Sequence, residues 1–326
     1  MRRREFVGLL GGAAIWPSAA HAQQPPIPVI GFLSSLAPRD LILVMPAFHD
    51  GLNRAGFTEG RNVSIEYRWA EGDYHRLPDL SANLVRRNVT VIAAISGTPA
   101  ALAAKAAATN IPIVFAIGGD PITSGLVPSL SHPSGNVTGV SFYNTALVTK
   151  RLELARELIA KETLVGMLVN PENPPSVAEG AAVQEAATAS GTPFQIFNVS
   201  AQSHMDHAFA AMEQNRIGVL IVSSDPFFFT ERVKLVVLTA RHALPTIFAD
   251  REQAEAGGLI SYGASRVDAY RQAGDYVGQI IKGKKPSELP VVLPTKFHLL
   301  INLKTAKSLH IDIPATVLSR ADEVIE

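Results

Sequence analysis

The sequence predicts an α/β protein made of two doubly wound parallel-sheet lobes with a central ligand cleft. Short apolar runs alternate with segments of helical periodicity, and this alternation starts again after about residue 144. The apolar runs lack polar alternation, which is typical of parallel strands covered by helices on both faces. A chain of 326 residues is long enough for two such units.

The clearest βαβ unit spans residues 91–125. Residues 91–95 form an unbroken apolar run, residues 100–108 an Ala-rich helix and residues 111–117 a second apolar run. Pro99 suits the first turn of that helix, where its missing N–H would have no helical partner. The residues that follow the two strands are Ser96, Gly97 and Thr98 after the first, and Gly118, Gly119, Asp120 and Pro121 after the second. Both groups should lie at the sheet edge where open α/β sheets bind ligands.

The other elements follow in order. In the first half, strands are expected at residues 28–33, 63–67 and 136–142 and helices at 41–55 and 77–87. In the second half, strands are expected at 164–169, 193–198, 217–222, 245–249 and 257–262, and helices at 145–159, 177–190, 204–214 and 231–242. Such alternation predicts parallel sheets in both halves.

The tail contains one long helix at residues 267–281, a β-like segment at 297–303 and a short helix ending near Leu309. The long helix is more than the second α/β unit needs, so we expect it to return to the first lobe. Lobe 1 would then comprise residues 27–143 plus about 263–288, and lobe 2 residues 144–262 plus about 289–326.

The N-terminus has the pattern of a signal peptide, expected at residues 1–22. Arg2, Arg3 and Arg4 precede a short apolar segment, and residues 20–22 form an A-x-A cleavage site. The apolar segment is too short to span a bilayer, which takes roughly 20 residues. Residues 3–7 also resemble the twin-arginine pattern, so the general secretory and twin-arginine export routes both stay open. We expect a periplasmic protein.

Composition and motifs exclude several classes of function. Lys and Arg together number 29, as do Asp and Glu, so no excess charge favours nucleic acid as a partner. The absence of cysteine excludes disulfides and thiolate sites. Residues 278–285 nearly match a P-loop but carry Lys at the magnesium-binding position. His204 and His207 lack a carboxylate cluster beyond Asp206. We therefore expect no cofactor, no metal and no catalytic residues.

Small polar residues at the ends of successive strands suggest a binding site. They are Ser34 and Ser35, Ser96 to Thr98, Asp120, Asn170, Asn173 and Ser176, and Ser223 to Asp225. One interpretation is that they cap helices and form turns. The other is that hydroxyls and helix N–H groups converge on an anionic or zwitterionic ligand, with Asp120 and Asp225 as partners of an ammonium group. Phe142, Phe227 and Tyr262 are among the aromatic residues near strand ends that could stack on the ligand. Core packing is the better interpretation for at least one of the three residues 227–229.

Several segments resemble the ABC-transporter substrate-binding family related to tryptophan- and tyrosine-binding TrpX proteins, of the type I periplasmic binding class. They are residues 137–141, 257–263, 294–297, 301–307 and 313–325. The resemblance implies two lobes that close on a ligand. By position, it also implies that Ser34, Ser35, Ser96, Gly97, Thr98, Asp120 and Pro121 line lobe 1, that Asn170, Asn173, Ser176 and Asp225 line lobe 2, and that Tyr262 lies near the hinge. The segment at residues 225–229 departs from the shorter polar loop associated with TrpX members.

These observations predict the solute-binding component of an ABC uptake transporter. The chain should act as a monomer, capture an amino acid or an aromatic carboxylate, and pass it to the membrane permease without catalysing a reaction. A ligand-sensing subunit of a membrane receptor and a secreted α/β enzyme remain the alternatives.

Overall fold

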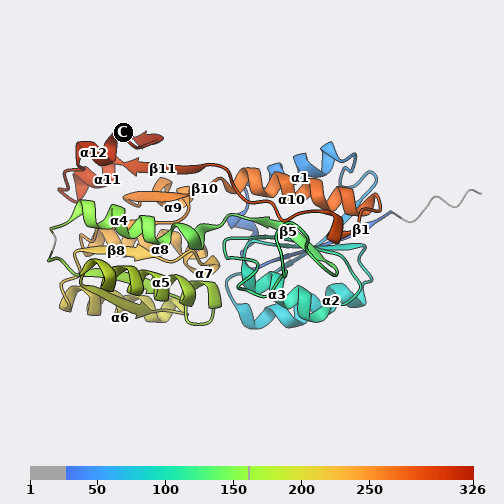
Figure 1. The fold of residues 1–326 in the computed structure, drawn as a ribbon, viewed down its shortest axis with the longest axis horizontal. Helices are drawn as coiled ribbons and strands as arrows, with labels where there is room; N and C mark the ends of the chain where they lie inside the picture. The colour runs from blue at the N-terminus through green and yellow to red at the C-terminus, as the bar shows by residue number, and fades with distance from the viewer. Residues whose placement is uncertain (1–26, 161) are drawn as a thin grey trace, which may run out of the picture.

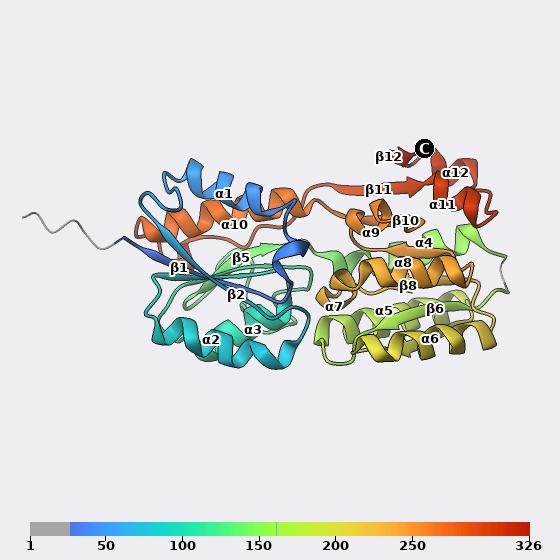
Figure 2. The same ribbon diagram turned by 180° about the vertical axis from the view of Figure 1, so that it is seen from behind.

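The computed structural model describes residues 27–160 and 162–326, so the expected signal peptide lies outside the described residues. The chain forms two α/β bodies that lie side by side along the long axis of the molecule (Figures 1 and 2). We call them lobe 1, which contains the N-terminal sheet, and lobe 2, which contains the other sheet. The predicted fold class of two α/β lobes is confirmed.

Lobe 1 is built on a five-stranded parallel sheet of order β2-β1-β3-β4-β5. Its strands are β1 (Val29–Ser34), β2 (Ser64–Trp69), β3 (Val91–Ile95), β4 (Ile113–Ile117) and β5 (Val137–Ser141). Its helices include α1 (Met45–Arg54), α2 (Leu77–Arg86) and α3 (Thr98–Ala107), with short 3-10 turns η1 (Pro38–Asp40) and η2 (Tyr74–Arg76). Every residue of β3, β4 and β5 is buried, which accounts for their unbroken apolar sequence.

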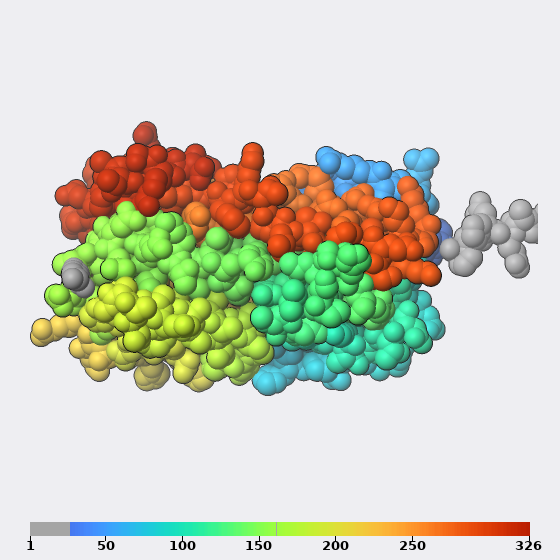
Figure 3. Space-filling view, viewed as in Figure 1, coloured from blue at the N-terminus to red at the C-terminus, as the bar shows by residue number. Residues whose placement is uncertain are grey.

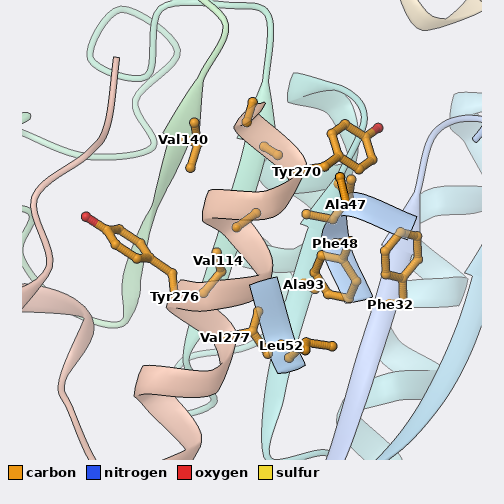
Figure 4. Close-up of a cluster of buried hydrophobic side chains, with 14 of the residues drawn as sticks. Phe32, Ala47, Phe48, Leu52, Ala93, Val114, Val140, Tyr270, Tyr276 and Val277 are labelled. Carbon is orange, nitrogen blue, oxygen red and sulfur yellow. The ribbon is translucent and has the colours of Figure 1, made fainter. Parts of the chain in front are cut away.

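The long helix α10 (Arg266–Ile281) packs on lobe 1. Tyr270 and Val277 are fully buried against α1 and the sheet (Figure 4). The two helices approach closely: a β-carbon added at Gly274 would lie 2.1 Å from the carbonyl oxygen of Phe48. This packing supports the expected return of the chain to lobe 1. The lobe boundaries by residue number stay a prediction.

Lobe 2 is built on a seven-stranded sheet of order β12-β11-β10-β9-β8-β6-β7. The strands are β6 (Val165–Val169), β7 (Phe194–Asn198), β8 (Val219–Val222), β9 (Thr246–Phe248), β10 (Ile260–Ala264), β11 (Phe297–Asn302) and β12 (Glu323–Ile325). The helices are α4 (Val148–Leu158), α5 (Pro174–Ser190), α6 (Gln202–Gln214), α7 (Pro226–Thr230), α8 (Arg232–Arg241), α9 (Arg251–Glu255), α11 (Leu303–Ser308) and α12 (Ala315–Leu318).

Several local expectations were wrong. The sheet of lobe 2 is not wholly parallel, because β11 pairs antiparallel with β10. The chain enters β11 from lobe 1, whereas it leaves β10 toward lobe 1. The two strands therefore run in opposite directions. The helix expected from residue 145 begins as a 3-10 turn, η3 (Asn144–Leu147), and becomes α-helical at Val148. Residues 226–230, for which no helix or strand was expected, form the short helix α7.

Three stretches of chain connect the lobes. One links β5 to η3, one links β10 to α10, and one links η4 (Pro286–Glu288) to β11. In the last of these, Val292 forms a bridge with Val140 and so still lies against lobe 1. The space-filling view shows the C-terminal part of the chain continuing across both lobes (Figure 3). None of the helices described has the length and apolar character that crossing a membrane requires.

Candidate functional site

A cavity lies where the two lobes meet. Lobe 1 and the connecting segments contribute Leu36, Ser96, Gly97, Thr98, Gly118, Gly119, Phe142 and Arg266, and lobe 2 contributes Asn173, Pro175, Ser224, Asp225, Pro226, Phe229 and Asp250. The cavity measures about 40 Å³, which is far less than a small organic ligand needs. The two walls are therefore nearly in contact.

Glycines allow this close approach. A β-carbon added at Gly97 would lie 2.7 Å from the Pro226 ring, and one added at Gly119 would lie 3.0 Å from the Pro175 ring. At Gly118 the added atom would lie 3.0 Å from Ser224 Oγ. All three glycines follow strands of lobe 1, and all three partners belong to lobe 2. At these three positions lobe 2 thus packs directly on the backbone of lobe 1.

Hydrogen bonds also join the lobes around the cavity. Tyr74 of η2 donates to Asp225 Oδ1 at 3.0 Å. Asp40 of η1 accepts from Thr230 Oγ1 at 3.1 Å and from Arg232 Nη1 at 2.5 Å. The Asp40 side chain is fully buried in this contact, and Phe229 of α7 packs into the same buried cluster as Leu36 and Phe142 of lobe 1. The structure is therefore a closed arrangement of the two lobes.

The N-terminus of α3 faces the cavity. Gly97, its N-cap, has φ +135° and makes no side-chain cap. Pro99 has no N–H, so the backbone N–H groups of Thr98 and Ala100 are the ones that keep their capacity to donate. Thr98 adds a hydroxyl to the cavity wall, while the hydroxyl of Ser96 bonds to that of Tyr270. Uncapped N–H groups and the helix dipole together favour an anionic group.

Arg266 adds a positive charge to the cavity wall. Its side chain is 6% exposed, and its guanidinium lies 4.1 Å from the centre of the Phe229 ring. Its two hydrogen bonds are long, 3.3 Å to Tyr270 Oη and 3.4 Å to Glu252 Oε1. A guanidinium has five N–H donors, so Arg266 has the capacity to bind a carboxylate as well.

Two carboxyl groups balance this charge. Burial raises the pKa of Asp250 to about 6, despite the opposing effect of the nearby Arg266. Burial also raises the pKa of Asp225, against the effect of its hydrogen bonds from Asn173, Asn170 and Tyr74. The cavity therefore combines one cation with two acidic groups, a set that suits a zwitterion better than a dianion.

A buried polar network supports the wall of lobe 2. Arg151 of α4 and Glu179 of α5 are fully buried, 3.5 Å apart between Nη1 and Oε2. Glu179 Oε2 accepts from the backbone N–H of Ser224 at 3.0 Å, and Arg151 donates to the carbonyl of Asn144. Asn144 Nδ2 donates to Ser224 Oγ at 3.2 Å. The network thus joins the cavity wall to the first connection between the lobes.

The structure brings five of the thirteen predicted residues together in the cavity wall: Ser96, Gly97, Thr98, Asn173 and Asp225. Five others lie behind that wall. Ser34 Oγ accepts from the N–H of Leu36, and Ser35 lies against Gly97. Asn170 donates to Asp225, and Ser176 bonds to Ser223 at 2.6 Å. Phe227 is also behind the wall, in the core of lobe 2.

The remaining three predicted residues serve local structure. Asp120 Oδ1 accepts from the N–H of Ile122 at 2.8 Å, and the carbonyl of Pro121 accepts from the N–H of Leu126 at 2.9 Å. Tyr262 is half-buried in lobe 2, with its ring 6.4 Å from that of Phe297. For these residues the capping and packing interpretation describes the contacts that they make.

Phe142, one of the aromatic residues expected to stack on a ligand, lies in the wall. Sequence reasoning missed other residues of the wall: Leu36, Pro175, Pro226, Phe229, Asp250 and Arg266. Gly118, Gly119 and Ser224 belonged to strand-end segments already noted but were not among the predicted binding residues. Arg266 had no recognisable signal, because it opens a helix of lobe 1 and reaches the cavity only through the second connection between the lobes. Among the described residues, no group of three or more His, Asp or Glu is arranged to hold a metal ion.

Two α/β lobes that close over a polar cavity define a bilobed solute-binding protein. The chain belongs to the ABC transporter substrate binding protein family, which it matches over residues 30–325. This confirms the family and the solute-binding function predicted from the sequence. The family is one of substrate-binding proteins.

Known relatives extend over most of the chain. A tyrosine-binding protein of Clostridioides difficile is 27% identical over 262 residues, which are 80% of this chain and 75% of that protein. A solved structure of an ABC domain in complex with L-Trp from Streptococcus pneumoniae has a TM-score of 0.83 at 28% identity, covering 91% of this chain and 99% of that one. A conserved domain protein from Vibrio cholerae has a TM-score of 0.84 at 27% identity with the same coverage.

Proposed function

We propose that this protein captures an amino acid or an aromatic carboxylate between its lobes in the periplasm and delivers it, as a monomer, to an ABC permease. The observation that carries this proposal is the position of the polar cavity, whose walls belong to different lobes. A solute bound there would contact both lobes and favour the closed arrangement over the open one.

The chemistry of the walls suits such a solute. The uncapped N-terminus of α3, the hydroxyl of Thr98 and the guanidinium of Arg266 are donors for its carboxylate. Leu36, Phe142 and Phe229 offer apolar surface for its side chain. The tyrosine-binding relative and the L-Trp complex support an aromatic amino acid as the first solute to test.

The solute needs more space than the present cavity provides. Sites for small organic ligands usually measure about 300–1,000 Å³, far above the open volume found here. Entry therefore requires the lobes to separate, and the size of the solute would set how far they close again. The hydrogen bonds of Asp40 and Tyr74 across the lobes are the contacts that such separation would break or lengthen.

The solute can be identified from protein purified without denaturation. We expect mass spectrometry of the small molecules released on unfolding to find about one equivalent of a compound with a carboxylate. Adding that compound at a hundredfold excess over Kd should stabilise the protein by about 2.7 kcal/mol in thermal unfolding. If neither the released compounds nor a panel of amino acids and aromatic acids stabilises the protein, the proposed class of solute is wrong.

A further inference from the structure

One amide in the cavity wall has an unused acceptor. Asn173 precedes α5 and is 2% exposed, and its Nδ2 donates to Asp225 Oδ2 at 2.7 Å. Its Oδ1 is buried and has no hydrogen-bond partner among the described residues. A carboxylate only accepts hydrogen bonds, so the contact with Asp225 fixes which end of the amide is the nitrogen. The oxygen is therefore the end left for another donor.

The carboxylate that holds this amide accepts hydrogen bonds from both lobes. Asp225 Oδ1 accepts from the N–H of Phe227 at 2.8 Å, from Tyr74 Oη at 3.0 Å and from Asn170 Nδ2 at 3.2 Å, and Oδ2 accepts from Asn173. Oδ1 thus has three donors, whereas Oδ2 has Asn173 alone, so the contact with Oδ2 orients the Asn173 amide. Asp225 therefore has a positioning role, in which it orients Asn173, and the sequence-based expectation that it also contacts a ligand ammonium group stays a prediction.

An unpartnered buried oxygen is costly unless a ligand supplies a donor. Hydrogen-bond donors for a solute carboxylate are already present elsewhere in the cavity, because α3 and Arg266 supply them. Asn173 lines the same cavity and its Oδ1 is an acceptor without a partner among the described residues, and Asp250 adds an acidic group to the cavity wall. Donors and acceptors together match a molecule with both a carboxylate and an amino group.

We propose that Asn173 Oδ1 accepts a hydrogen bond from the amino group of the solute and so selects amino acids over carboxylic acids that lack this group. The inference rests on the proposed function and narrows it. Asn173 is the specificity-determining contact, and Asp225 and Tyr74 position it from the two lobes. Closing the lobes brings Tyr74 to Asp225, so closure also fixes the acceptor in place.

The test compares matched pairs of compounds by titration calorimetry on solute-free protein. The pairs are L-tryptophan with indolepropionate, L-phenylalanine with phenylpropionate, and L-leucine with isocaproate, which differ by the amino group. In whichever pair binds, wild-type protein should bind the amino acid about tenfold or more tightly than the acid without the amino group. Asn173→Leu should reduce this preference to about twofold while binding of the acid without the amino group persists.

Asn170→Leu is the matched control, because Asn170 also donates to Asp225 but does not line the cavity. It should keep the preference for the amino acid. Equal weakening of both compounds by Asn173→Leu, or an unchanged preference, would overturn the inference and leave the proposed function standing. Failure of the wild-type protein to bind any compound of the three pairs would overturn the inference together with the amino-acid proposal.

Discussion

Replacing Gly119 by alanine should weaken solute binding by about one to two orders of magnitude while the fold stays intact. The added β-carbon would lie 2.7 Å from Thr98 Oγ1 and 3.0 Å from the Pro175 ring. The Thr98 hydroxyl can rotate away, but the proline ring is fixed at the start of α5. Overpacking of this kind costs about 1–3 kcal/mol, and here the cost falls on closure because the two residues belong to different lobes. Titration calorimetry would measure the change.

Gly180→Ala is the matched control for this prediction. A β-carbon there would lie 3.0 Å from the side chain of Val169, so it adds a methyl group to a tight contact within lobe 2. This variant should bind solute as the wild type does. Wild-type affinity in Gly119→Ala would show that the solute does not require lobe 1 and lobe 2 to meet at this edge.

Replacing Arg151 by methionine should lower the free energy of unfolding by about 3–5 kcal/mol, because it leaves the carboxyl of Glu179 buried without its cation. Both side chains are fully buried. Burial already raises the pKa of Glu179 to about 7, against the opposing effect of Arg151. The ionised carboxyl is thus less favourable in the folded chain than in the unfolded chain.

The raised pKa of Glu179 makes the stability of the folded state depend on pH. Below the usual pKa of about 4.5, the neutral carboxyl of Glu179 makes its full contribution to stability relative to higher pH. This contribution is lost as the pH rises through about 7. Without Arg151 the folded-state pKa rises further, so the loss should continue above pH 7. Urea unfolding at about pH 5 and about pH 8 would measure it.

The double variant Arg151→Met with Glu179→Gln provides the control. Removing both charges should restore part of the stability and flatten its pH dependence between those two conditions. If the single variant were as stable as the wild type at both pH values, the buried pair would not support the wall behind Ser224.

Much of the fold could be predicted because it depends on local patterns. Unbroken apolar runs such as that of β3 identified buried parallel strands, and the polar residues after them identified the sheet edge. The antiparallel direction of β11 could not be predicted, since it follows from the third connection between the lobes. The helix α7 was missed because its three phenylalanines lack helical periodicity in so short a segment.

The site could be predicted only in part, for a related reason. Residues at strand ends share one sequence signal, whether they face the cavity as Thr98 does or cap a turn as Asp120 does. Only tertiary contacts separate the two cases. Arg266 and Phe229 reach the cavity through connections and a short helix, and nothing in the local sequence marks either as part of a cavity.

The central claim is that an amino acid brings the two lobes together. Because the chain has no cysteine, two fluorophores can be attached through Arg86→Cys on α2 and Glu185→Cys on α5, both exposed positions. Titrating the amino acid that binds should change the energy transfer between them in a saturable manner, with the midpoint at the calorimetric Kd. The same titration in the Gly119→Ala background should give a smaller change. Binding measured by calorimetry without any change in energy transfer would contradict the account.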